Sequence, residues 1–212
     1  MEQSANLSKD FAKELIVART TVAQEQFDSN VEWRLFCDGS ESAFIKLYNH
    51  YFDLLYNLGR QYSGDAELLK DALQDVFVNI RKKRSKLHKV KFVKAYLIKC
   101  YRNKIITEQK KQKRKSRYKS NSGAFDFYFA PSHESVLINT QFRQGQIQQI
   151  KKSLNKLTRR QREALYYFYY NGLSYAQIKE VMGFSSVRAA RNLIYRSLSQ
   201  LKKNFQDLNT NS

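Results

Sequence analysis

The C-terminal third of the chain carries start and stop signals for two closely connected helices, and these constrain its fold more than any other feature. Ser174 can accept a hydrogen bond from the first turn of a helix, and Gln177 three residues later completes a capping box. Gly183 can adopt the left-handed conformation that ends this helix. Ser185 or Ser186 then caps a second helix. The segment is therefore predicted to form a helix, a tight turn and a helix.

The second of these helices has an apolar side and a basic side. Its apolar residues recur at helical spacing and predict a buried stripe of Val187, Ala190, Ile194, Leu198 and Leu201. The opposite side carries Arg188, Arg191, Asn192 and Tyr195. Helix-turn-helix proteins present this part of their second helix to the major groove. We therefore favour DNA reading over a helical hairpin whose arginines merely face water.

Helix-breaking residues are rare, with one proline and seven glycines in 212 residues. This scarcity predicts long, uninterrupted helices, and no segment alternates convincingly as a strand would. Hydrophobic residues make up 42% of the chain, enough for packed cores. The expected fold class is all-α, with two small helical domains joined by a flexible linker, the C-terminal one containing the helix-turn-helix.

The N-terminal half predicts three amphipathic helices. One follows Ser40 and ends before Gly64, the next is capped by Asp65, and the third begins near Phe92. The C-terminal half predicts helices over 134–155 and 158–170 before the helix-turn-helix, with Thr158 and Gln161 as a second capping box. The expected domains are a leader at 1–30, a helical domain at 31–117, a linker at 118–133, a second domain at 134–204 and a tail at 205–212.

The linker contains an aromatic segment, FDFYF at 125–129, that is unusual for a passive tether. Either it packs on a neighbouring domain or a partner holds it. No apolar run approaches the ~20 residues of a membrane span, and the N-terminus does not resemble a signal peptide. Cys37 and Cys100 have no metal-type spacing and suit a reducing cytoplasm as free thiols, although pairing between them stays open.

Charge is divided along the chain rather than spread evenly. Residues 1–80 hold seven Lys and Arg against 13 Asp and Glu, whereas residues 81–120 hold 18 against one. Residues 151–212 are basic again, with 12 against three. This division suggests that different surfaces meet different partners.

The basic run at 81–120 has aromatic residues among its cations, an arrangement that suits an unstacked nucleic-acid strand. Most of these rings are expected in the core, with Tyr96 the best candidate for an exposed platform. Asn103 has the donor and acceptor to read a base edge, and a capping or core hydrogen bond is nearly as good an interpretation.

No catalytic, metal-binding or cofactor-binding residue is predicted. Glu67, Asp71 and Asp75 share one helical face, but a metal site needs carboxylates that converge from several elements. An exposed acidic face that meets a basic partner is the favoured interpretation. The three histidines, His50, His88 and His133, are far apart and are read as ordinary residues.

The order of these pieces resembles an RNA polymerase sigma factor of the extracytoplasmic-function group, over roughly residues 40–204. The C-terminal half carries LTRRQREAL from Leu157, GLSYAQI from Gly172, Met182-Gly183 and YRSL from Tyr195. The N-terminal half carries DALQDVF from Asp71, FVKAYL from Phe92 and Arg102-Asn103. Two departures are Thr107-Glu108, where family members usually have an aspartate, and Gln177-Ile-Lys179 in place of the common Glu-Ile-Ala.

The resemblance implies a non-enzymatic factor that directs promoter-specific initiation through the −10 and −35 elements. Its implied partners are core RNA polymerase (β′ clamp helices and β flap) and promoter DNA, without a small-molecule substrate; an anti-sigma factor is left open. The implied core-binding residues are Asp71, Gln74, Asp75 and Phe77. The implied −10 residues are Lys91, Lys94, Tyr96, Lys99, Arg102 and Asn103. The implied −35 residues are Ser185, Ser186, Arg188, Ala189, Arg191, Asn192 and Tyr195.

Two other functions are weighed against this one. A stand-alone helix-turn-helix regulator would bind duplex DNA by itself, but it would leave the acidic helix and the aromatic-basic helix unexplained. A nuclease using the carboxylate face would reveal itself by metal-dependent cleavage.

Overall fold

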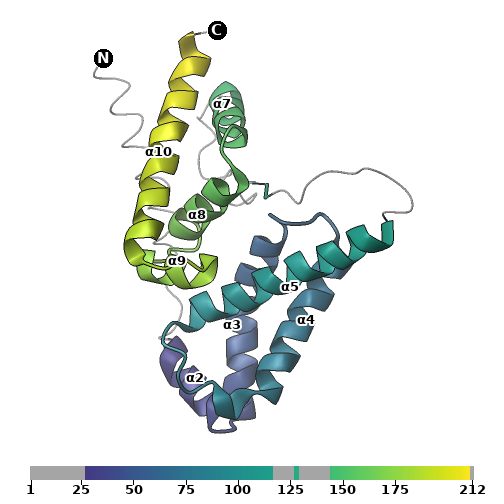
Figure 1. Ribbon diagram of the computed structural model, residues 1–212. Coiled ribbons are helices and arrows are strands. Elements are labelled where there is room, and N and C mark those ends of the chain that lie inside the picture. Colours follow the sequence, from purple (N-terminus) through teal and green to yellow (C-terminus); the bar gives the residue numbers. More distant parts are fainter. Residues whose placement is uncertain (1–26, 117–126, 129–143, 211–212) are drawn as a thin grey trace. The chain divides into compact units, whose positions relative to one another are not determined.

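The computed structural model describes residues 27–116, 127–128 and 144–210. The chain divides into two compact units, with residues 27–128 in the first and 144–210 in the second (Figure 1). Every regular element in these ranges is a helix, which confirms the predicted all-α class. Within the same ranges, no helix is long and apolar enough to cross a membrane.

Four α-helices and a short 3₁₀ turn build the first unit. They are α2 (Ser29–Cys37), α3 (Glu41–Gly59), α4 (Ala66–Lys82), η1 (Arg84–Lys86) and α5 (Val93–Ser116). The predicted caps are present: the Ser40 hydroxyl accepts the Ala43 N–H at 3.2 Å, and the Asp65 carboxylate accepts the Leu68 N–H at 3.1 Å. Helix α5 contacts α2, α3 and α4, so the basic helix is supported along its apolar side (Figure 1).

Helix α2 was not predicted from the sequence, yet it completes the core of the first unit. It buries Trp33, Phe36 and Cys37. The Trp33 Nε1–H donates to the Leu87 carbonyl at 3.1 Å and so ties α2 to the turn that precedes α5. The Cys37 and Cys100 thiols are both free, as expected.

The α3–α4–α5 packing depends on the absence of a side chain at Gly59. A Cβ at this position would come within 2.4 Å of the Tyr101 hydroxyl and 2.9 Å of Leu69 Cδ2. The Tyr101 ring is fully buried, and its hydroxyl donates to the Leu69 carbonyl at 3.1 Å. A glycine here lets α5 approach α3 closely enough to place that hydroxyl on α4.

Phe127, from the centre of the predicted linker, is fully buried against the first unit. Its ring meets the Tyr62 ring edge-on at 4.9 Å between centroids, and the next N–H, of Tyr128, donates to the Gln61 carbonyl at 2.7 Å. The Gln109 side chain of α5 donates to the Tyr62 carbonyl at 2.6 Å, so α5 contacts the same corner of the unit, the one formed by Gln61 and Tyr62. Part of the aromatic segment therefore packs on the preceding domain; Phe125, Asp126 and Phe129 lie outside the described residues.

Four helices build the second unit: α7 (Gln144–Asn155), α8 (Arg159–Tyr169), α9 (Tyr175–Met182) and α10 (Val187–Thr210). Both predicted capping boxes are present, Thr158 with Gln161 and Ser174 with Gln177. Gly183 ends α9 at φ 67°, as predicted. The first part of the helix expected at 134–155 lies outside the described residues, and α7 is its remainder.

Helix α10 contacts α7, α8 and α9 (Figure 1). The buried stripe predicted for it is only partly right: Ala190 and Ile194 are buried, Leu198 and Leu201 are half-buried, and Val187 is 39% exposed. Val187 is the first residue of α10. Farther along, the buried Asn204 side chain donates to the Ser153 carbonyl at 3.0 Å and fastens α10 to α7.

Candidate functional site

The predicted acidic surface lies on α4, where Asp71, Gln74 and Asp75 are exposed. The carboxylates differ in their surroundings. Asp75 forms an ion pair with Lys104 of α5 at 2.5 Å, and Lys104 also pairs with Glu108 at 2.8 Å. Hydrogen bonds that the Lys104 ammonium donates to Asp75 and then to Glu108 raise the pKa of Lys104. Asp71 makes no comparable pair with any described residue and remains available to a partner.

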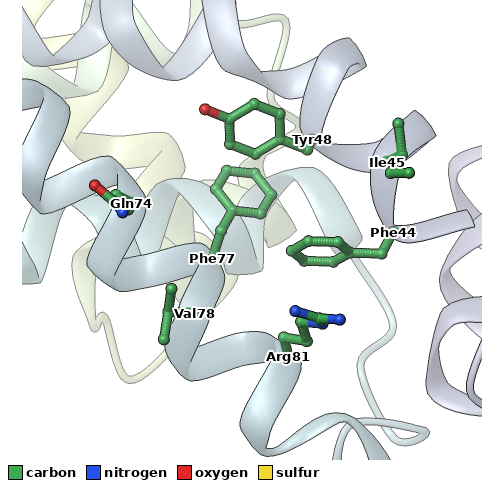
Figure 2. A pocket seen from close by; sticks show the side chains of 7 residues that line it. All are labelled: Phe44, Ile45, Tyr48, Gln74, Phe77, Val78 and Arg81. Atoms are coloured by element: carbon green, nitrogen blue, oxygen red, sulfur yellow. The ribbon is translucent and has the colours of Figure 1, made fainter. Parts of the chain in front are cut away.

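An apolar groove lies beside this surface, between α3 and α4 (Figure 2). Its volume is about 260 Å³. Phe77 lies at the base of the groove and is only 3% exposed, with its ring 4.9 Å from Tyr48 and 6.1 Å from Phe44 between centroids. Two exposed apolar residues, Ile45 and Val78, stand at the groove, being 57% and 40% exposed. Predicted core-binding residues Gln74 and Phe77 both line it.

Arg81 closes one end of the groove (Figure 2). Its guanidinium lies 5.6 Å from the centre of the Phe44 ring and pairs with Glu41 of α3 at 2.8 Å. The surface thus combines apolar side chains with a free carboxylate, a combination suited to another protein rather than to a polyanion.

The basic surface predicted to read the −10 element lies on and just before α5. Lys91 and Asn103 are exposed, whereas Lys94, Tyr96, Lys99 and Arg102 are half-buried. The Asn103 carbonyl accepts a hydrogen bond from the Thr107 hydroxyl at 2.8 Å, which leaves its side-chain amide outside that bond.

Tyr96 is less open than a free stacking platform would be. Its ring meets Trp33 edge-on at 5.7 Å between centroids, and its hydroxyl interacts with Cys100. Burial is the main reason that the Tyr96 pKa rises to about 12. The more exposed ring at this end of α5 is Phe92, at 39%.

The predicted −35 residues gather at the start of α10. Ser185, Ser186, Arg188, Arg191, Asn192 and Tyr195 are exposed, and Ala189 is half-buried. Of the two candidate caps, Ser186 does the capping, because its hydroxyl accepts the Ala189 N–H at 3.2 Å. Tyr195 is 72% exposed, the most open of the large apolar or aromatic side chains in the described residues.

Arg160 of α8 holds the turn between α9 and α10. Its guanidinium lies 4.6 Å from the centre of the Phe184 ring and donates to the Met182 carbonyl at 3.4 Å. That carbonyl belongs to the last turn of α9, where a cation is favoured. The angle at which α10 leaves the turn is therefore supported from α8.

The described residues contain no group of three or more His, Cys, Asp or Glu side chains placed to hold a metal ion. His50 stacks on Phe27 at 3.8 Å between centroids, and His88 lies 3.9 Å from Asp38.

Each of the two units matches a known protein family model. Residues 47–115 match the family described as "Sigma-70 region 2", and residues 147–201 match "Sigma-70, region 4". The chain belongs to the sigma-70 family. It is a sigma factor that directs transcription initiation, and factors of this family are non-enzymatic DNA-binding regulators. The presence of regions 2 and 4 supports the predicted resemblance to the extracytoplasmic-function group.

Two solved structures share the fold of this sigma factor. CnrH, in complex with the cytosolic domain of CnrY, is 19% identical, with a TM-score of 0.56 over 86% of this chain and 98% of that one. The sigma factor RpoE from Bartonella quintana, in complex with the anti-sigma factor NepR, is 20% identical, with a TM-score of 0.56 over 77% and 96%. No curated protein sequence matches the chain.

Sequence reasoning identified the exposed residues of this sigma factor better than it identified the groove. It did not single out Ile45, Val78 or Arg81, which line the groove. The signal that could have found the groove is Ile45 and Val78 themselves, two apolar residues that fall beside the buried stripes of α3 and α4.

Proposed function

We propose that this sigma factor docks on core RNA polymerase through α4 and the groove beside it, and reads promoter DNA through α5 and α10. The observation that carries the proposal is the separation of chemistry: an apolar groove next to the free Asp71 carboxylate on α4, and basic surfaces on α5 and α10. The surface on α4 suits a partner protein, and the basic surfaces on α5 and α10 suit a polyanion.

The residues assigned to core are Asp71, Gln74 and Phe77, with Ile45 and Val78 added by the groove. Asp75 is assigned a different task from the one expected, because Lys104 already pairs with it. We propose that the β′ clamp helices occupy this surface. The family position of the DALQDVF segment supports that choice.

The −10 element is assigned to α5, and the −35 element to the start of α10. On α5, the exposed Asn103 and Lys91 are the best placed to meet the melted strand, with Phe92 as the more accessible ring. On α10, Arg188 and Arg191 lie in the first turns of the helix, where the major groove is met. Bidentate arginine pairing to guanine discriminates by ~1–3 kcal/mol, whereas a phosphate contact weakens all sequences alike.

Because core polymerase acts in the cytoplasm, the proposed function implies a cytoplasmic protein. The free thiols of Cys37 and Cys100 are compatible with that reducing compartment. An anti-sigma factor is a second candidate partner, because the solved RpoE and its anti-sigma factor NepR form a complex. The exposed apolar side chains Ile45 and Val78 are the surface such an inhibitor would cover in competition with core.

The decisive experiment compares promoter binding by the protein alone, by core alone and by the mixture, at one salt concentration, together with promoter-specific run-off transcription. Promoter-specific transcripts should appear only with the mixture. Nonspecific binding by the protein alone should fall steeply with salt, as expected for the basic surfaces. Tight, sequence-specific binding by the protein alone would contradict the proposal and favour a stand-alone regulator.

A further inference from the structure

Two aromatic side chains and one arginine, each from a different helix of the second unit, are in contact with one another. The Phe168 ring of α8 stacks on the Tyr175 ring of α9, with centroids 5.1 Å apart and planes inclined by 16°. The Arg191 guanidinium of α10 lies over the same Tyr175 ring, 5.4 Å from its centroid. Tyr175 is therefore held on one side by the helix before it and meets Arg191 of the helix that follows.

This contact restricts Arg191 without using up its donors. An arginine paired with a carboxylate spends the N–H groups of its planar fork, whereas an arginine on an aromatic face keeps its in-plane N–H groups free. No ion pair joins Arg191 to a carboxylate among residues 144–210, and its side chain is exposed. The fork is thus both limited in its motion and open to a ligand.

Arg188 lies one turn earlier and provides the comparison. It is also exposed, but no ring or carboxylate of the described part of the second unit restricts its side chain. An unrestricted arginine loses rotamer entropy when it is fixed on one base, whereas a pre-positioned one loses less. The two arginines are therefore not equivalent, although their sequence positions look alike.

From this geometry we infer that Tyr175 is a positioning residue for sequence discrimination: it holds Arg191 for bidentate pairing with a base edge in the upstream promoter element. Arg188, without such support, contacts phosphate. The inference rests on the proposed assignment of α10 to the −35 element and names the residue within it that selects sequence.

The test uses the full chain assembled with core polymerase and measures affinity for the promoter divided by affinity for the same promoter with a scrambled upstream element. Tyr175→Phe keeps the ring and should keep this ratio. Tyr175→Leu removes the ring but keeps an apolar side chain, and should lower the ratio about two- to fivefold, the fold-change that corresponds to an exposed cation–π contact. In an Arg191→Ala background, Tyr175→Leu should lower the ratio no further.

The same set of variants can overturn the inference. A ratio unchanged in Tyr175→Leu, a loss in Tyr175→Phe equal to that in Tyr175→Leu, or an equal loss in the Arg191→Ala background would each show that Tyr175 does not act through Arg191. Arg188→Ala serves as the matched arginine control and should weaken consensus and scrambled promoters alike.

A second measurement needs no DNA and no stable leucine variant. The Arg191 Nε–H resonance of the free protein should show a ring-current shift in the wild type and in Tyr175→Phe; an unshifted resonance in the wild type would contradict the contact itself. Failure of the proposed function gives a different result: Arg191→Ala and Arg188→Ala would both leave promoter use unchanged while the ring-current shift persists.

Discussion

The Lys104 ammonium of α5 bridges Asp75 of α4 and Glu108 of its own helix, at 2.5 and 2.8 Å. Lys104 falls in the basic helix predicted to meet DNA, and Asp75 on the acidic face predicted to meet the polymerase. The ion pair between Lys104 and Asp75 therefore links the helix that carries the basic surface, α5, to the helix that carries the acidic surface, α4. A charge change at Asp75 would therefore disturb α5 as well as α4, and a test of core binding is cleaner at Asp71.

Asp71→Lys should weaken binding to core polymerase by about tenfold or more, because it reverses an exposed charge beside the groove. Helical content should not change, since the Asp71 side chain is exposed. Binding can be measured by fluorescence anisotropy with labelled protein. The matched control is Asp53→Lys, the same charge change at an exposed position on α3. Equal affinities of the two variants would remove Asp71 from the interface.

Ile45→Asp should also weaken core binding, because it places a charge at the apolar groove shown in Figure 2. Ile45 is 57% exposed, so the free energy of unfolding should change by only about 0.5 kcal/mol. Leu35→Asp provides the control, since Leu35 is a similarly exposed apolar residue on α2, outside the groove. If both substitutions reduce core binding alike, the groove has no special part in it.

Phe127→Ala should destabilise the first unit by about 3–5 kcal/mol, the usual cost of truncating a fully buried phenylalanine. Trp33 is the only tryptophan and lies in the core of this unit, so its fluorescence reports the unfolding of this unit during urea titration. Tyr128→Ala is the neighbouring control: that side chain is 62% exposed and its loss should cost about 0.5 kcal/mol or less. Equal unfolding midpoints for wild type and Phe127→Ala would mean that the anchor contributes nothing.

The first unit should lose stability as pH falls below the ordinary histidine pKa of 6.5. His50 is exposed overall, but partial desolvation of its imidazole, which stacks on Phe27, and then the nearby Lys94 charge lower its pKa in the folded protein. The unfolded chain therefore binds a proton more readily than the folded one, so the contribution of His50 is present above pH 6.5 and is lost as pH falls toward the lowered pKa.

Urea midpoints followed by Trp33 fluorescence between pH 5 and 8 measure this dependence. His50→Phe retains a ring to stack on Phe27, and should reduce the loss of stability on the acidic side. A variant whose midpoint falls with pH as steeply as that of the wild type would show that other groups cause the effect.

Local signals were read correctly from the sequence because their partners lie three or four residues away. The capping boxes at Thr158 and Ser174, the cap at Asp65 and the left-handed Gly183 all belong to this class. The family assignment succeeded for a related reason: short motifs kept their order along the chain.

The features that sequence reasoning missed depend on which helices lie side by side. The groove needs α3 next to α4, and the Tyr175–Arg191 contact needs the angle between α9 and α10. Periodicity placed Val187 in the apolar stripe, whereas this first residue of α10 is 39% exposed. For Phe127, composition marked the segment as unusual but left open what it packs against, since its partner Tyr62 is distant in sequence.

The position of Phe127 limits where the first unit can be separated from the rest of the chain. The last helix of the first unit ends at Ser116, but the unit recruits a side chain from farther along the chain to fill the corner at Tyr62. A chimera that joins this first unit to the second unit of another sigma factor at the end of α5 would therefore inherit an incomplete core. A junction placed after Tyr128 would keep Phe127 with the first unit, and so would leave the corner at Tyr62 filled in the chimera.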